Sequence, residues 1–296
     1  MDETNRIPWP NGARAAVSFS FDMDADSLLY LRYRQDAANM VGTLSYLRYG
    51  PRVAVPQICQ LFESRGLKAS FFVPGWCIEA HGAAVERILK GGHELGHHGY
   101  LHEEPHKQTP DQERHWTERA LRIIERVTGG MPAGYRAPFY SYSRNTADLI
   151  AEFGFLYDSS LMSDDLPYRV ETRSGGRFIE IPVHWSVDDW AQYAHSFDLE
   201  YMMPIQPPSK AKEVYLADFE AAYESGGFLE YVWHPFISGR PARLRAIGEI
   251  VDHMIAKGDV WIATTEEIAR HTASMEAAGR FRPYVETLPY PVVPFD

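Results

Sequence analysis

The sequence contains few cysteines, no long apolar run and no excess of basic residues, and each absence excludes a class of protein. Its two cysteines, Cys59 and Cys77, lie among apolar residues and without a C-x-x-C spacing. We expect both to be reduced and buried, with a single disulfide as the alternative. The opening residues MDETNRIPWPNG lack an apolar signal-peptide core, and no run of eighteen apolar residues follows, so we expect a cytoplasmic protein without a membrane span.

Basic residues are in the minority. Lys and Arg number 29 against 40 Asp and Glu, which gives a net charge of −11, and such a surface repels phosphate backbones and anionic lipids. We therefore expect a small-molecule substrate, and neither nucleic acid nor a membrane as a partner. Hydrophobic residues make up 45% of the chain, which is enough for a full core. The length favours a single domain over residues 1–296.

Strand and helix patterns alternate along the chain. Residues 15–21 alternate strictly, with Val17, Phe19 and Phe21 on one face and small or polar residues on the other, which is typical of a strand. Strands separated by helices predict right-handed crossovers and a largely parallel sheet, and about seven strands predict an α/β fold closed or nearly closed into a barrel. The predicted strands are 15–21, 68–73, 93–96, one near Tyr135, 155–157, 179–183, 228–233 and 260–264.

Helices are predicted between these strands. We expect an aromatic loop over 28–51 and a proline-rich extended arm from about residue 280 to 296. The small, polar face of the first strand fits a barrel interior, so its Val and Phe face should meet the helices. One predicted helix carries Ile58, Leu61 and Phe62, and two others begin at the Thr109 capping box and at Thr265. The remaining predicted helices span 83–90, 146–153, 212–223 and 241–256.

Carboxylates follow the first predicted strand. Asp22 and Asp24 continue its polar face, so both should project toward the barrel mouth where catalytic groups gather. Two ionised carboxylates this close together repel each other, which costs free energy unless a positive charge lies between them. The alternative is a solvated acidic turn. A calcium loop is disfavoured because Ser27 and Tyr33 occupy the positions of its glycine and its glutamate.

Histidines cluster around the third predicted strand. Five of the twelve lie within fourteen residues, where a uniform scatter would place about 0.6. His98 and His102 should reach the same mouth as the aspartates, and two imidazoles with a carboxylate suit zinc or another divalent transition metal. Any one of these histidines alone is more often a core or surface residue. The cluster comprises His93, His97, His98, His102 and His106.

Two further strand ends carry polar residues. Arg136 precedes an X-Pro turn, so it could orient a carboxylate, and backbone amides near Phe139 or Tyr140 could stabilise an oxyanion. His234 ends an apolar strand and has a pKa suited to a general acid. The alternative for Arg136 is a charged residue before an ordinary loop, and His234 taken alone is more often a structural histidine.

The ordered set D-x-D, H-x-x-x-H, R-A-P and a strand-terminal His resembles the polysaccharide deacetylases, the carbohydrate esterase family four and its relatives. The resemblance spans roughly residues 17–262 and implies a distorted (β/α) barrel. It implies metal ligation by Asp24, His98 and His102. It also implies that Asp22 is the catalytic base, that Arg136 orients this base, and that His234 is the acid.

Departures from the family pattern bear on the substrate. Secreted sugar deacetylases usually carry adjacent aspartates, a glycine after R-x-P and a D-x-D-W segment. This chain has D-M-D in place of the adjacent aspartates, Phe139-Tyr140 in place of the glycine, and Asp158-Ser159-Ser160 in place of D-x-D-W. Allantoinase-like members are described as lacking the metal aspartate, whereas Asp24 is present. The chain resembles most the branch with cyclic imide hydrolases, allantoinase-like enzymes and a peptidoglycan-deacetylase-like group.

The sequence therefore predicts a zinc-type hydrolase of a non-peptide amide C–N bond, in a cyclic imide or related cyclic amide. Deacetylation of an N-acetylglucosamine-containing, peptidoglycan-type substrate is the alternative, and a barrel that only binds metal is the third reading. The resemblance also implies a homo-oligomer, with a tetramer as one option. The tyrosines Tyr30, Tyr33, Tyr46 and Tyr49 could line the pocket or a subunit interface. Substrate contacts are expected from Phe139, Tyr140, Trp185, Asp188 and Asp189.

Overall fold

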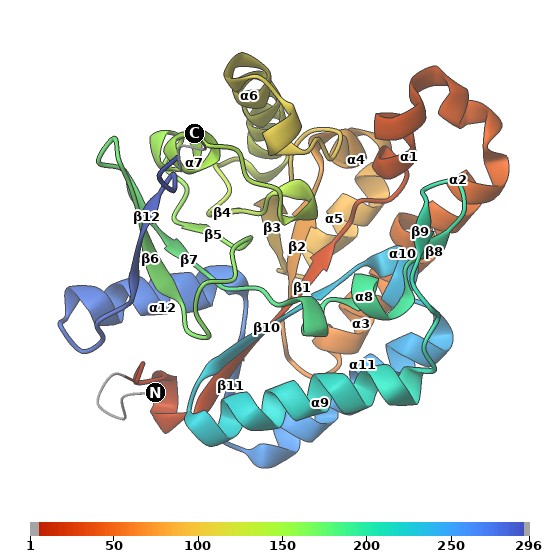
Figure 1. Cartoon of the computed structure of the whole chain (residues 1–296). Helices are drawn as coiled ribbons and strands as arrows, with labels where there is room; N and C mark the ends of the chain where they lie inside the picture. The colour runs from red at the N-terminus through yellow and green to blue at the C-terminus, as the bar shows by residue number, and fades with distance from the viewer. Residues whose placement is uncertain (1–5, 293–296) are drawn as a thin grey trace.

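The structure is a computed structural model that describes residues 6–292, and it is built around one curled sheet of ten strands (Figure 1). The strand order is β10-β1-β2-β3-β4-β5-β7-β6-β12, and β11 also pairs with β1. Most pairs in this sheet are parallel, and β6 and β7 are antiparallel. The predicted α/β barrel is thus confirmed as a half-barrel. The strands are β1 (Ala15–Asp22), β2 (Ser70–Val73), β3 (Glu94–His97), β4 (Gly134–Tyr135), β5 (Tyr157–Asp158), β6 (Tyr168–Thr172), β7 (Arg177–Glu180), β10 (Phe228–Trp233), β11 (Val260–Ala263) and β12 (Val285–Leu288).

Strand β1 lies at the centre of the fold. It pairs with β10 over its length, so that Phe21 lies beside Trp233, and its end pairs with β2. Its apolar face packs outward on the helices: the Phe19 and Phe62 rings are 5.3 Å apart. Its polar face turns inward, where Ser20 binds the guanidinium of Arg136 at 2.8 Å. The predicted orientation of the first strand is therefore confirmed.

Helices cover the outside of the sheet (Figure 1), and those predicted from the apolar period are present. Thr109 and Gln112 form the predicted capping box. The helices are α1 (Ser27–Tyr33), α2 (Val41–Leu47), α3 (Val55–Glu63), α4 (Gly75–Ala80), α5 (Gly82–Lys90), α6 (Pro110–Thr128), α7 (Thr146–Glu152), α8 (Asp189–Tyr193), α9 (Pro208–Ser225), α10 (Pro235–Ser238), α11 (Pro241–Lys257) and α12 (Thr265–Ala277), with a separate hairpin of β8 (His195–Ser196) and β9 (Tyr201–Met202).

Two segments differ from the sequence prediction. The segment expected as an aromatic loop over 28–51 folds largely into α1 and α2, because its tyrosines and leucines pack inward. The expected C-terminal arm contributes β12, which pairs in parallel with β6 of its own chain. Residues 293–296 of that arm lie outside the described residues. Both predicted thiols are confirmed: Cys59 and Cys77 are free and buried.

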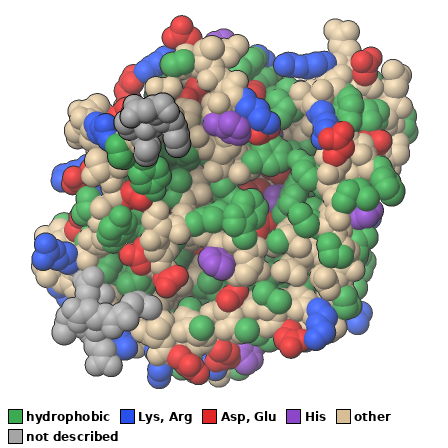
Figure 2. Space-filling view, viewed as in Figure 1, with side chains coloured by type: hydrophobic (Ala, Val, Ile, Leu, Met, Phe, Trp, Pro, Cys, Tyr) green, Lys and Arg blue, Asp and Glu red, His purple; other side chains and the backbone are tan. Residues whose placement is uncertain are grey.

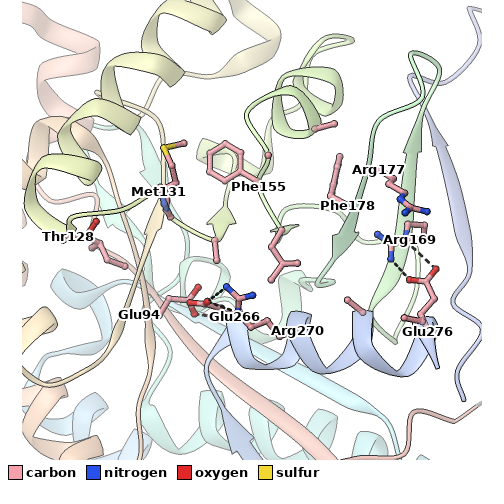
Figure 3. Close-up of a pocket in the computed structure, with 18 of the residues that line it drawn as sticks. Glu94, Thr128, Met131, Phe155, Arg169, Arg177, Phe178, Glu266, Arg270 and Glu276 are labelled. Carbon is pink, nitrogen blue, oxygen red and sulfur yellow. Dashed lines mark hydrogen bonds and ion pairs between the residues drawn. The ribbon is translucent and has the colours of Figure 1, made fainter. Parts of the chain in front are cut away.

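The amino-terminal end of the half-barrel is hollow. Because β4 and β5 have only two residues each, a cavity of about 1040 Å³ opens between β3 and β7 above α12. Figure 3 shows Arg169 directed at Glu276, and Arg270 beside Glu266 on the helix below. This hollow lies at the end of the sheet opposite to Asp22, the last residue of β1.

None of the helices in residues 6–292 is long and apolar enough to cross a membrane.

The short strand β4 depends on a glycine. A methyl group on Gly134 would lie 2.0 Å from Cζ of Tyr157, whose hydroxyl donates to Glu94. Gly134→Ala is expected to destabilise the fold by roughly 1–3 kcal/mol through overpacking, measured by chemical denaturation. Gly42→Ala is the control, because nothing lies within 4 Å of its added methyl. Equal stability of the two variants would contradict the packing at β4.

Candidate metal centre and active site

The site lies at the carboxyl ends of four strands of the sheet, β10, β1, β3 and β4. Asp22 ends β1 and Asp24 follows two residues later, while His98 follows β3 and His234 follows β10. His102 lies on the loop after His98, and Arg136 follows β4. None of these six residues is more than 6% exposed. The structure therefore brings together all six residues that the sequence singled out for metal binding and catalysis.

Asp24, His98 and His102 form a group with the geometry of a metal site. Their ligand atoms lie within 4.8 Å of one another. The Nε2 atoms of His98 and His102 are 3.3 and 3.4 Å from Oδ1 of Asp24. Both carboxylate oxygens of Asp24 and Nε2 of His98 are buried without a hydrogen-bond partner within the described chain. Buried polar atoms are rarely unpaired, so this convergence fits a cation held between them.

The histidines are prepared as ligands. Nδ1 of His98 contacts the carbonyl oxygen of Arg136 at 2.8 Å, which fixes the ring and leaves Nε2 free. Burial lowers the pKa of His102 to about 4, so its ring is neutral at pH 7. Burial would raise the pKa of Asp24, but His102, His98 and His234 outweigh this and lower it to about 2. Neutral imidazole and carboxylate are the forms that bind divalent metals.

Asp22 stands beside this group and belongs to a separate network. Its Oδ1 accepts a hydrogen bond from NH1 of Arg136 at 2.8 Å, and its Oδ2 is 3.7 Å from Nε2 of His98. The same guanidinium donates to Glu230 and to Ser159. Burial would lower the pKa of Arg136, but Asp22 and Glu230 raise it further above its ordinary value. Asp22 is thus oriented by Arg136 with one oxygen directed at the metal group.

The third aspartate of the D-x-D-x-D run has a structural role. Asp26 accepts from Arg48 at 2.5 Å and contacts Nε2 of His81 at 2.6 Å. It therefore ties the segment after α2 and the end of α4 to the loop that carries Asp24. The Cys77 thiol supports the same loop by donating to the carbonyl oxygen of Asp24 at 3.0 Å.

His234 is held by Asp189. Nδ1 of His234 is 2.7 Å from Oδ1 of Asp189, whose Oδ2 accepts the backbone N–H of His234 at 3.0 Å. Its Nε2 lies 3.5 Å from Asp24. Burial would lower the pKa of His234, but Asp189 outweighs it and raises the pKa to about 10. The imidazole of His234 is therefore protonated at neutral pH, and its Nε2 is directed at the metal group.

Aromatic side chains enclose the site. The cavity next to the acids and histidines measures about 50 Å³, and in Figure 2 acidic and histidine side chains show at the bottom of a hollow rimmed by hydrophobic ones. The Phe139 ring is 4.4 Å from that of His102, and the Trp190 ring is 4.9 Å from that of His234. Tyr140 packs on Trp185 at 5.0 Å and donates to Asp188 at 2.6 Å. Such walls exclude water from the reacting groups.

The expected substrate contacts are placed unevenly. Phe139, Tyr140, Trp185 and Asp188 line the cavity, but Asp189 does not, because both of its oxygens bind His234. Sequence reasoning missed this orienting role. The signal for it in the sequence is the Asp-Trp pair at residues 189–190, which matches the end of the family's D-x-D-W pattern. The comparison with residues 158–160 placed this pattern at the wrong segment.

The first-loop tyrosines do not line the catalytic cavity. Tyr30 packs on Trp76, and Tyr46 packs on Phe236. The Tyr33 hydroxyl donates to the backbone carbonyl of Asp198. The Tyr49 hydroxyl donates to the backbone carbonyl of Gly239.

One expected oxyanion donor is engaged elsewhere. The amide of Tyr140 donates to the carbonyl oxygen of Ala137 at 2.9 Å, within the turn η5 (Pro138–Tyr140). Phe139 and Tyr140 both have positive φ, 56° and 53°. A non-glycine residue rarely adopts this conformation, and strain of this kind concentrates at functional sites.

Known proteins share both sequence and fold with this chain. The family model for polysaccharide deacetylase matches residues 48–157. The crystal structure of a "putative polysaccharide deacetylase" from Mycobacterium smegmatis is 39% identical, with a TM-score of 0.89 and coverage of 98% of both chains. A peptidoglycan deacetylase from Helicobacter pylori is 28% identical over 75% of this chain and 84% of its own length. The Puue allantoinase, at 24% identity and a TM-score of 0.80 over 94% of this chain and 95% of its own, shares the fold. The chain therefore belongs to the polysaccharide deacetylase family of amide C–N hydrolases, in which metal dependence is typical.

Proposed function

We propose that this protein is a zinc-type hydrolase that opens the C–N bond of a small cyclic imide or related cyclic amide. The observation that carries the proposal is the convergence of a metal-binding group, the separate carboxylate of Asp22 and the imidazole of His234 on one enclosed cavity of about 50 Å³. This cavity is small, so it favours a compact reacting group. The nitrogen and carboxylate ligands favour zinc.

A divalent cation between Asp24, His98 and His102 would supply a Lewis acid that polarises the amide carbonyl and acidifies water at the site. Asp22 is the base in this proposal. It takes a proton from the attacking water because Arg136 fixes its carboxylate and leaves Oδ2 beside the metal group. A neutral amide in place of Asp22 could not accept this proton.

His234 is the acid. Its Nε2 faces the cavity and Asp189 keeps the imidazole protonated, so it can give a proton to the departing nitrogen. When the C–N bond of the ring breaks, the nitrogen must receive a proton so that it leaves as a neutral amide or amine. Without this proton the nitrogen is a poor leaving group. Asp22 and His234 flank the cavity as base and acid, the division of roles expected for amide hydrolysis.

The second candidate function is N-deacetylation of an N-acetylglucosamine-containing substrate. The relationship to the Helicobacter pylori peptidoglycan deacetylase favours it. The same catalytic groups would then release acetate, and the sugar would lie across the mouth beside Trp185, which is 50% exposed. A cytoplasmic location and a homo-oligomer, with a tetramer as one option, are part of the first proposal.

Metal binding can be tested by removing single ligands. Wild-type protein is expected to bind about one zinc ion per chain, and His98→Ala and Asp24→Asn to bind far less, measured by metal analysis after dialysis. Zinc should raise the melting temperature of the wild type but not of these variants. His115→Ala is the control, because His115 is exposed and outside the site. Full occupancy in both ligand variants would contradict the assignment.

The base and its orientation can be separated from metal binding. Asp22→Asn is expected to keep its zinc and to lose roughly 10²–10⁴-fold in kcat. Asp189→Asn should lower kcat with less effect on KM, because it loosens and deprotonates His234. The exposed Asp36→Asn serves as control. Wild-type turnover in Asp22→Asn would show that another group is the base.

The substrate class can be decided in one assay. Zinc-loaded protein should be given succinimide, glutarimide, hydantoin, allantoin and chitooligosaccharides in parallel, with ring opening and acetate release measured separately. We expect ring opening without acetate. Acetate release alone would replace the first candidate function by the second, and neither product with stoichiometric zinc would favour a barrel that only binds metal.

A further inference from the structure

A second cavity of about 660 Å³, here called the outer cavity, lies next to the catalytic one. Phe139 lines both, with its ring packed on His102 on the catalytic side. The outer cavity is walled by the end of α1, the loop after His102, the start of α6 and the separate hairpin. It is therefore one aromatic ring away from the metal group and much larger than the catalytic cavity.

Most charged groups around this outer cavity already have partners. Arg32 binds Glu200, and Lys107 binds Glu104 at 2.8 Å. Glu103 accepts the backbone amides of two neighbouring residues at 3.0 and 2.9 Å. Arg34 also lines the cavity, and it makes no ion pair or hydrogen bond through its side chain within residues 6–292. One guanidinium at the cavity is thus available to a ligand.

Two neutral groups of the same cavity also lack partners in the described part of the chain. The side-chain oxygen of Gln108 is buried without a hydrogen bond, and rotation of its terminal amide would turn a donor or an acceptor to the cavity. Within residues 6–292 the Tyr201 hydroxyl makes no hydrogen bond, although its ring is fixed against Trp190 at 4.6 Å. Unpaired polar groups in a cavity are the groups that fix the orientation of a ligand.

We propose that the outer cavity binds a carboxylate-bearing arm of the amide substrate, with Arg34 as the partner of the carboxylate. Guanidinium binds carboxylate bidentately, and Gln108 and Tyr201 would hydrogen-bond the polar atoms of the arm. The proposal rests on the proposed amide hydrolysis and deepens it, because it makes the substrate an acid rather than a neutral imide. Arg34, Gln108 and Tyr201 are then specificity-determining residues.

The hollow at the other end of the barrel does not serve this purpose. It is larger, and Arg169 and Arg270 are paired with Glu276 and Glu266, as Figure 3 shows, whereas Arg177 makes no side-chain ion pair or hydrogen bond within residues 6–292; its position is what excludes it. It also shares none of its lining residues with the catalytic cavity, whereas the outer cavity shares Phe139. A substrate arm that starts at the metal group can enter only a cavity next to it.

Matched pairs of probes test the proposal through turnover. Hydantoin is compared with hydantoin-5-acetic acid, and N-acetylglucosamine with N-acetylmuramic acid, so that each pair differs by a carboxylate arm. We expect kcat/KM to be at least about tenfold higher for the acid in the pair that is hydrolysed, an energy difference of about 1.4 kcal/mol. Arg34→Gln should lower this ratio at least about fivefold. Arg52→Gln, an exposed arginine outside the cavity, should leave the ratio as in the wild type.

Binding provides the readout that does not depend on turnover. Calorimetric titration of zinc-loaded Asp22→Asn with each pair should show tighter binding of the acid, and the double variant with Arg34→Gln should lose that preference. Equal binding and equal turnover of acid and neutral probe would overturn the inference and leave the proposed hydrolysis intact. Tighter binding of the acid without turnover of any probe by the wild type would support the cavity and contradict the proposed function.

Discussion

The buried guanidinium of Arg136 is the constraint on which the site depends. Its N–H groups are bound by Asp22, Ser20, Glu230 and Ser159, so it joins β1, β10 and the segment after β5 from inside the half-barrel. Burying one cation with two carboxylates carries a desolvation cost that hydrogen bonds only offset when every partner is present. Removing any one of these partners would leave a buried N–H group of the guanidinium without an acceptor. The orientation of the proposed base is therefore part of the packing of the sheet and not an adjustment made at its surface.

The half-barrel places reactive groups by the ends of its strands. Each of β1, β3, β4 and β10 delivers one or more polar side chains just past its last residue, and their parallel direction brings these side chains to one rim. An aromatic wall then removes the rim from water. Charges of opposite sign lie in a setting with little screening, where a carboxylate and an imidazole a few ångströms apart shift each other's affinity for protons strongly. The proton affinities at the site therefore depend on the short distances between the buried charged groups as much as on which residues carry them.

Much of this site could be predicted because its signals are local. The alternation in 15–21 identifies β1, and the rule on strand ends then places Asp22 and Asp24 beside the histidines. The aromatic segment after it has no clean period, so α1 and α2 were missed. The partnership of Asp189 with His234 is set by tertiary structure across 45 residues, for which no spacing rule exists. The strands β6 and β12 likewise depend on a pairing between distant segments, and their alternation is short.

The evenly spaced aspartates 22, 24 and 26 have three different surroundings: the Arg136 network, the group with His98 and His102, and the contacts to neighbouring helical segments. The chain turns after Asp24, since Ala25 has a φ of 48°, so inserting or deleting one residue between positions 22 and 26 would shift these carboxylates relative to one another. The length of this five-residue segment is therefore fixed by the three carboxylates that it carries. Relatives that keep all three aspartates should keep this spacing as well.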